Sequence, residues 1–279
     1  MIAGVGSAFR LIGVVNVTPD SFSDGGAFLD ADAAIAQGRR LAGEGADLLD
    51  VGGESTRPGA APVDVGEELR RVLPVIEALA TDGAATLSID TSKLEVARAA
   101  LDAGAAYVND VTAFRAAPEL AGLVADRDVE CCLMHMLGEP RTMQADPRYD
   151  DVVSEVKAFL AERLAFAVRE GVPEVRISLD PGIGFGKTVA HNLDLLRRLD
   201  ELVELGRPVV IGTSRKSFLG RITGRDVTER VPATLATCVI AYLRGARTFR
   251  VHDVAPARDA LLVTAATVTG RWSSTTTAS

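Results

Sequence analysis

Short runs of β-branched and apolar residues recur eight times along the chain, at intervals of roughly 20 to 45 residues. Between them lie segments whose apolar residues recur with helical spacing. Strands that alternate with helices pair in parallel, through right-handed crossovers. The chain is therefore predicted to be an α/β protein with strands at residues 11–18, 46–53, 85–91, 107–112, 130–136, 175–182, 208–214 and 248–254.

Eight strand–helix units predict a closed (β/α)8 barrel, the TIM barrel, and an open doubly wound sheet is the alternative. Nearly every predicted strand ends on polar or glycine residues. In a barrel these ends converge on one mouth, where active sites lie, whereas an open sheet spreads them along an edge. We therefore predict a single barrel domain over residues 1–270. The Ser/Thr-rich residues 271–279 are expected to be a disordered tail.

Three of the intervening segments show clear helical patterns. Residues 64–80 place apolar side chains on one face, and Asp64 and Glu67 resemble a capping box. Pro74 lies inside this segment and should kink or break the helix. Further helices are predicted over residues 151–169 and after Thr188.

Composition excludes several classes of protein. A net charge of −8 argues against general binding to nucleic acid or anionic membranes. No apolar run approaches the roughly 18 residues of a membrane helix, and the first residues do not resemble a signal peptide. The three cysteines form no C-x-x-C pair, so buried free thiols in a reducing cytoplasm are expected. The three histidines show no zinc pattern.

The loop after the first predicted strand, residues 16–26, is polar and turn-prone. One interpretation is an ordinary connection with a helix cap at Asp30. The other is a mobile active-site loop, in which the amide oxygen of Asn16 and nearby carboxylates meet a hard cation such as Mg²⁺. The residues alone leave both interpretations open.

The loop after the second predicted strand reads G-G-E-S-T-R-P-G over residues 52–59. It can be a glycine-rich turn. Serine, threonine and arginine beside two glycines can also cradle a carboxylate or phosphate, and we favour this second interpretation.

Asp90, Asn109 and Asp180 each lie at the end of an apolar predicted strand. A buried carboxylate is costly without a partner, so each must pair internally or face a ligand. Two carboxylates and an amide at one mouth match the edge of a flat heterocycle with adjacent N–H donors and a ring carbonyl. A 2-amino-4-oxo-pterin has that edge and fits a narrow pocket.

The segment D-P-G-I-G-F-G-K-T, residues 180–188, resembles a phosphate loop only superficially, because its glycine spacing is neither the Rossmann nor the Walker one. Its glycines are expected to turn the chain sharply and to place Phe185 against the plane of the ligand. Lys187 is then expected to be a solvated surface residue.

Cationic residues end the last two predicted strands. Period-two alternation puts Arg250 and His252 on the same face, and phosphate sites in this fold typically use the last two strand–helix units. We therefore predict that Arg250 and His252 bind a diphosphate, with Lys216 close by. Salt bridges from these cations to Asp90, Asp180 or Asp253 are the alternative.

Taken together in this order, the motifs resemble the dihydropteroate synthase family, a group of pterin-binding barrels, over roughly residues 11–268. The segments that carry the resemblance are N-V-T-P-D-S-F-S-D-G-G, G-G-E-S-T-R-P-G, S-I-D-T, N-D-V, H-M-L-G-E-P-R-T-M-Q-A-D-P-R-Y, D-P-G-I-G-F-G-K, S-R-K-S and R-V-H-D. The combined set is highly specific, although any one piece is weak.

The resemblance implies condensation of a dihydropterin methyl diphosphate with 4-aminobenzoate in folate synthesis, with Mg²⁺ as cofactor and Asn16 as the residue near Mg²⁺ and diphosphate. It implies pterin contacts from Thr56, Asp90, Asn109, Asp180 and Lys216, and diphosphate contacts from Arg250 and His252. It further implies a 4-aminobenzoate site, where sulfonamides compete, framed by Thr56, Arg57, Pro58, Ser214 and Arg215. Asp90, Asp180, Lys216, Arg250 and His252 are the expected catalytic residues.

One departure concerns the loop after the fourth predicted strand. Many relatives have Ser-Gly-Gly where this chain has Thr112-Ala113-Phe114, which leaves the shape of this loop open.

Two other activities compete with this interpretation. One is a pterin-dependent methyltransferase barrel, which would need a corrinoid partner but neither the diphosphate-facing cations nor the Asn16 loop. The other is a paralogue that binds pterin without condensing it. The resemblance also implies a homodimer, formed through helices remote from the mouth.

Overall fold

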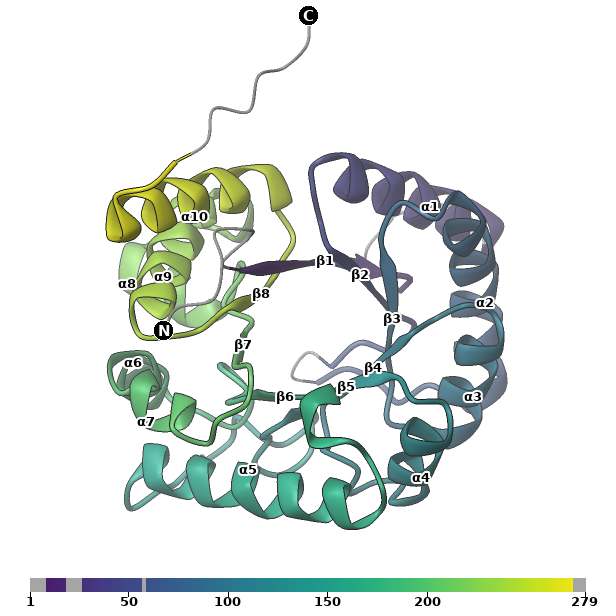
Figure 1. Cartoon of the computed structure of the whole chain (residues 1–279), viewed down its shortest axis with the longest axis horizontal. Coiled ribbons are helices and arrows are strands. Elements are labelled where there is room, and N and C mark those ends of the chain that lie inside the picture. The colour runs from purple at the N-terminus through teal and green to yellow at the C-terminus, as the bar shows by residue number, and fades with distance from the viewer. Residues whose placement is uncertain (1–8, 19–26, 57–58, 273–279) are drawn as a thin grey trace, which may run out of the picture.

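A computed structural model describes residues 9–18, 27–56 and 59–272. These residues form an eight-stranded sheet of parallel strands in the order β6-β5-β4-β3-β2-β1-β8-β7. An isolated parallel bridge between Leu179 and Val209 joins the two ends, so the sheet closes into a barrel (Figure 1). The strands are β1 (Arg10–Asn16), β2 (Leu48–Gly52), β3 (Thr86–Asp90), β4 (Tyr107–Asp110), β5 (Glu130–Met134), β6 (Ile177–Asp180), β7 (Val210–Ile211) and β8 (Thr248–Val251). The predicted (β/α)8 barrel is confirmed.

Helices surround the barrel on its outside (Figure 1). They are α1 (Ala27–Gly43), α2 (Val65–Asp82), α3 (Leu94–Asp102), α4 (Glu119–Asp126), α5 (Val152–Arg169), α6 (Val189–Arg197), α7 (Leu199–Val203), α8 (Ser217–Thr223), α9 (Val231–Leu243) and α10 (Val254–Thr269), with 3-10 turns at Glu174–Arg176 and Val227–Glu229. No helix of the described residues is long and apolar enough to cross a membrane.

The three predicted helices are present. Asp64 caps α2, because its carboxylate accepts a hydrogen bond from the Glu67 backbone N–H at 2.9 Å. Pro74 does not break this helix, which continues to Asp82. The helix after the first strand begins at Ala27, before the cap expected at Asp30. The rest of the first loop, residues 19–26, and the tail from residue 273 lie outside the described residues.

Alternation along the strands divides the apolar residues into two layers. Side chains that face outward pack under the helices in the main core. Those that face inward form a small cluster that fills the barrel: Ile12, Leu48, Tyr107, Cys132 and Val210. Cys131 belongs to the outer layer and Cys132 to the inner one, so the adjacent thiols are free, buried and on opposite faces, as expected.

The loop after β4 adopts a left-handed backbone at two residues that are not glycine. Ala113 and Phe114 have φ of 53° and 61°, which costs an L-residue roughly 1–2 kcal/mol each. The Asp110 carboxylate holds the turn by accepting from the Thr112 and Phe114 backbone N–H groups, both at 2.7 Å. The buried Arg163 of α5 donates to the Ala113 carbonyl at 2.8 Å. These hydrogen bonds therefore hold the loop in a left-handed conformation that is usually adopted by glycine.

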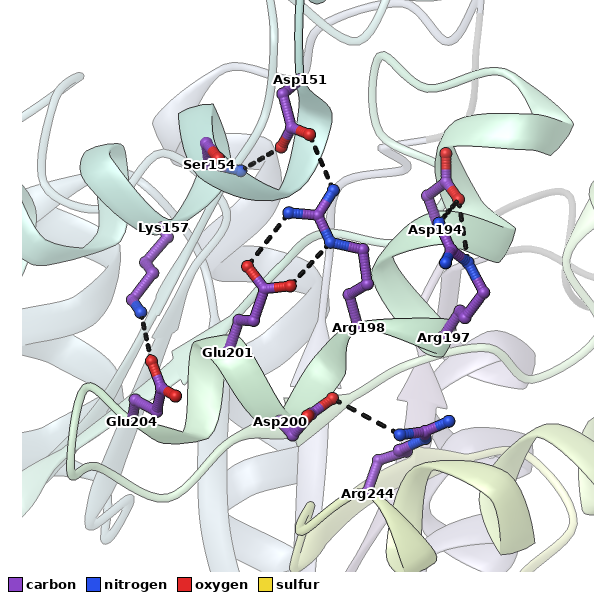
Figure 2. A network of polar contacts seen from close by, with 10 residues as sticks. All are labelled: Asp151, Ser154, Lys157, Asp194, Arg197, Arg198, Asp200, Glu201, Glu204 and Arg244. Carbon is purple, nitrogen blue, oxygen red and sulfur yellow. Dashed lines mark hydrogen bonds and ion pairs between the residues drawn. The ribbon is translucent and has the colours of Figure 1, made fainter.

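Polar contacts at the surface link α5 and α9 to residues 198–204, whereas Asp194 and Arg197 pair within α6 (Figure 2). Arg198, which separates α6 from α7, donates to Asp151 at 2.7 Å and to both oxygens of Glu201. Its guanidinium lowers the pKa of the Asp151 carboxyl. Single exposed ion pairs of this kind stabilise a protein little.

Replacing Arg163 by methionine tests the support of the loop after β4. Arg163→Met leaves the buried Ala113 carbonyl without its donor, so the free energy of unfolding should fall by about 2 kcal/mol in urea titrations. Arg169→Met is the matched control, because Arg169 also lies over the Phe166 ring, at 5.8 Å, but is exposed. Equal effects of the two substitutions would contradict this role of Arg163.

Candidate active site

The mouth of the barrel gathers polar side chains from strands far apart in the sequence. Asp90 ends β3 and Asn109 lies one residue before the end of β4, and the two are direct partners in the sheet register. Asp180 ends β6 and is buried. Gly212 follows β7, and an atom added at its Cβ position would be 3.8 Å from Arg250 Cβ and 3.9 Å from Asp180 Oδ2. Arg250 therefore reaches the same region as both acids.

Arg250 is bound between two carboxylates. Its Nε donates to Asp50 Oδ2 at 2.7 Å and its Nη2 donates to Asp90 Oδ2 at 2.8 Å. The salt bridge between Arg250 and Asp90, which was the alternative to diphosphate binding inferred from the sequence, is thus present. The partner Asp50 was missed, although it lies two residues before the end of β2 and so faces inward like that end.

Asp180 and Lys216 form a second part of the site. The Gly182 backbone N–H donates to Asp180 Oδ1 at 2.6 Å. Lys216 Nζ donates to the Ile183 carbonyl and lies 4.2 Å from the centre of the Phe185 ring. Phe185 packs against a cluster of Val111, Met134, Met136 and Met143. Asp180, Phe185 and Lys216 therefore lie in one part of the mouth.

Burial favours the uncharged forms of Asp90, Asp180 and Lys216. Burial, with repulsion from Asp50, raises the pKa of Asp90 to about 7, although Arg250 opposes the shift. Burial lowers the pKa of Lys216 to about 7, against the attraction of Asp180. Burial also raises the pKa of Asp180. Such shifted groups at one mouth are typical of functional sites.

The residues after β7 and β8 also meet. Ser214 Oγ lies 3.0 Å from His252 Nδ1 and accepts from the His252 backbone N–H at 3.2 Å. Arg215 Nη2 donates to Asp253 at 2.5 Å. Asp253 is therefore the partner of Arg215 and not of Arg250.

Lys187 is buried, so the expectation of a solvated surface residue is wrong. Its side chain folds inward, where Nζ lies 2.9 Å from His135 Nδ1 and donates to the Phe185 carbonyl at 3.0 Å. Burial lowers the pKa of Lys187, and burial together with Lys187 lowers that of His135 to about 2. Gly182, two residues after Asp180, allows this close packing, since a Cβ there would lie 1.8 Å from the His135 carbonyl oxygen.

A cavity of about 290 Å³ opens beside Asp90 and the loop after β2. Of the predicted site residues, Thr56 and Asp90 line it, whereas Arg57 and Pro58 lie outside the described residues. Its wall includes Glu54 and Glu68, which share Lys93: Nζ donates to Glu54 Oε2 at 2.5 Å and also to Glu68 Oε2. Glu68 Oε1 has no hydrogen-bond partner among the described residues.

Asn16 ends β1 at the same mouth, opposite Gly52 in the register. The described residues contain no cluster of three or more His, Cys, Asp or Glu side chains that would hold a metal ion. Residues 19–26, which follow in the same loop and include Asp20 and Asp24, lie outside the described residues.

Acids around a narrow mouth, with cations beside them, suit a flat heterocycle that carries an anionic group. The sequence model of the pterin binding enzymes matches residues 12–252, so the chain is a pterin-binding barrel enzyme. It is 43% identical over 262 residues to the dihydropteroate synthase of Escherichia coli K12, covering 94% of this chain and 93% of that protein. The chain belongs to the dihydropteroate synthase family.

Solved structures agree with this assignment. A Xanthomonas albilineans dihydropteroate synthase with 4-aminobenzoic acid is 53% identical, with a TM-score of 0.88 over 93% of each chain. The dihydropteroate synthase of that organism in complex with 7,8-dihydropteroate has 50% identity and a TM-score of 0.84, again over 93% of each chain.

Replacing Lys187 tests its corrected position. Lys187→Met should lower the free energy of unfolding by about 2 kcal/mol, because the Phe185 carbonyl and His135 lose a buried partner. Lys157→Met is the control, since Lys157 pairs at the surface with Glu204 and should cost under about 0.5 kcal/mol. A solvated Lys187 would give the same small effect as the control in chemical denaturation.

Proposed function

We propose that this chain condenses (7,8-dihydropterin-6-yl)methyl diphosphate with 4-aminobenzoate, giving 7,8-dihydropteroate and diphosphate in folate synthesis. It is a transferase that forms a C–N bond. The observation that carries the proposal is the meeting of Asp90, Asn109 and Asp180 with Arg250 at one barrel mouth, in a chain of this family.

The pterin ring lies among Asp90, Asn109, Asp180 and Lys216 in this proposal. Carboxylate and amide oxygens accept from the ring N–H and amino groups, while the Lys216 ammonium donates to the ring carbonyl. Phe185 lies beside Lys216 and supports one face of the site. Burial of these groups strengthens each hydrogen bond relative to water.

The reaction requires electrostatic stabilisation and positioning. The methylene C–O bond breaks and its electron pair leaves with the diphosphate. The dihydropterin delocalises the resulting positive charge, and Asp90 and Asp180 stabilise it. The lone pair of the aniline nitrogen forms the new C–N bond, after which the nitrogen releases a proton. Because the amine is already neutral, the chain needs no nucleophile–base pair of its own.

Arg250 and His252 bind the departing diphosphate in this proposal, with Thr56 at the rim. The contacts to Asp50 and Asp90 use two of the five N–H donors of Arg250, which leaves the guanidinium able to bind an anion as well. Asn16 is the residue that would hold Mg²⁺, which as a cofactor would neutralise charge on the leaving group.

The second substrate, 4-aminobenzoate, is proposed to lie between the loops after β2 and β7. Thr56, Arg57, Pro58, Ser214 and Arg215 would frame it, and sulfonamides would compete there. Thr56 lines the cavity described above, which supports this placement. Arg215 is held by Asp253, so it would act mainly by shaping the loop.

We also propose that the enzyme works in the cytoplasm as a homodimer. Its three cysteines are free, which suits a reducing compartment. The neighbouring helices α9 and α10 expose large apolar side chains, which suits burial against a second copy: Ile240, Leu243, Leu262, Val263 and Val268. These helices lie outside the barrel and leave its mouth open to substrates.

A two-substrate assay tests the activity. The chain with both substrates and Mg²⁺ should release diphosphate, and Asp180→Ala or Asp90→Ala should reduce turnover about a thousandfold, because the cationic pterin loses its counter-charge. Asp194→Ala, which removes a surface partner of Arg197, is the control and should keep full activity. Methyl transfer without diphosphate release would indicate the corrinoid-dependent reaction, and tight pterin binding without turnover would indicate a paralogue that no longer condenses its substrates.

The shifted pKa values predict the pH dependence of pterin binding. Below about 7 Asp90 becomes protonated and loses an acceptor, and above about 7 Lys216 loses its proton. Affinity for a 7,8-dihydropterin without phosphate, measured by calorimetry, should therefore peak near neutral pH. Lys216→Arg keeps its charge at high pH, so it should remove only the alkaline decrease. An alkaline decrease that persists in this variant would refute the role of Lys216.

A further inference from the structure

Asp50 lies deeper in the barrel than the predicted site residues, and its side chain is only 1% exposed. Its carboxylate accepts three hydrogen bonds: from Ser88 Oγ at 2.5 Å, from Asn109 Nδ2 at 3.0 Å and from Arg250 Nε at 2.7 Å. Two of these donors belong to the proposed pterin and diphosphate site. None of the motifs that carry the family resemblance contains Asp50.

We propose that Asp50 is a positioning residue that fixes which atoms Asn109 and Arg250 present to the substrate. The inference rests on the proposed pterin site and deepens it. An ionised carboxylate only accepts hydrogen bonds, so the Asn109 amide must turn its NH₂ group toward Asp50. Its Oδ1 then faces away from Asp50 and serves the mouth as an acceptor.

This orientation gives the mouth three acceptor side chains. Asp90 and Asp180 are acceptors when ionised, and Asp50 makes Asn109 a third acceptor. A ligand must therefore present N–H donors to all three, as the 2-amino edge of a dihydropterin does. An amide that turned freely would offer a donor half of the time and discriminate less.

Asp50 also fixes the plane of the Arg250 guanidinium. Asp50 is buried, whereas the side chain of the second partner, Asp90, is 14% exposed at the mouth. A ligand that engages Asp90 can therefore weaken its bond to Arg250 while the Asp50 bond holds the cation in place. Arg250 keeps a buried counter-charge throughout.

Exchanging the side chains of Asp50 and Asn109 tests the proposal. In Asp50→Asn the side chain keeps one acceptor oxygen and gains an NH₂ donor, so it no longer forces the NH₂ group of Asn109 toward position 50, and the Asn109 amide can also turn that group to the mouth. The KM for the pterin substrate should then rise at least about tenfold, which corresponds to the loss of one hydrogen bond of about 1.4 kcal/mol. The kcat should fall by a smaller factor.

The double variant Asp50→Asn with Asn109→Asp restores the pair in reverse. The carboxylate introduced at position 109 accepts from the amide introduced at position 50 through one oxygen and keeps the other for the ligand. The KM should therefore return to within about threefold of the unmodified chain. Asn109→Asp alone places two carboxylates together and should be at least as impaired as Asp50→Asn. Recovery in the double variant is a readout that a purely structural role would not give.

Ser88→Ala is the matched control, because it removes the third hydrogen bond to Asp50 and leaves Asn109 and Arg250 in place. It should lower stability and leave KM within about twofold. If Asp50→Asn does not fold, the double variant carries the test: folding and pterin binding close to normal support the proposal. A double variant no better than Asn109→Asp, or a normal KM in Asp50→Asn, would overturn it.

The unmodified chain separates this proposal from the proposed function. If it releases no diphosphate, the condensation activity fails, and calorimetric binding of a 7,8-dihydropterin replaces KM as the readout of the exchange. If it is active and the exchange gives no recovery, only the positioning role of Asp50 fails.

Discussion

The ion pairing of Arg250 inside the barrel is the interaction on which the site depends. An arginine on the inner face of a strand is stable only with buried counter-charges, and Asp50 and Asp90 supply them from two other strands. These bonds link β8 to β2 and β3, so they also fix the spacing of the two acids. The same carboxylates remain hydrogen-bond acceptors, so the pairing that stabilises the cation prepares the site for a ligand rich in N–H groups.

The geometry of parallel strands makes this arrangement possible. Every second residue of a strand points into the barrel, and below the mouth these positions hold an apolar cluster and three small polar residues, Ser88, Ser178 and Thr248. The apolar cluster is Ile12, Leu48, Tyr107, Cys132 and Val210. The next inward positions along β2, β4 and β8 are Asp50, Asn109 and Arg250. These polar groups are buried, which strengthens their mutual attraction and shifts the pKa values of Asp90 and Lys216 toward 7.

The fold and most of the mouth could be predicted because both follow from short-range patterns. Strand periodicity located the barrel and placed Asp90, Asn109, Asp180 and Arg250 at its carboxyl end. Two residues were misjudged because a sequence pattern does not show how deeply a side chain is buried. Lys187 follows a glycine-rich loop that looks exposed, but the left-handed backbone of Gly184 and Gly186 turns it inward toward His135. Asp50 was missed because an acid within an apolar strand gives no sign of its three donors until the strands are brought together.

The loops differ from the strands because they depend on particular side-chain contacts. The turn after β4 keeps its left-handed backbone at Ala113 and Phe114 only because Asp110 and Arg163 bind its backbone groups and Phe114 is fully buried. Glycine would reach this shape without such support. The strain is therefore offset by packing between the loop and α5, on the outer side of the barrel. Side-chain contacts thus stabilise this loop from the outer side of the barrel, while Val111, on the inner face, packs beside Phe185 at the mouth.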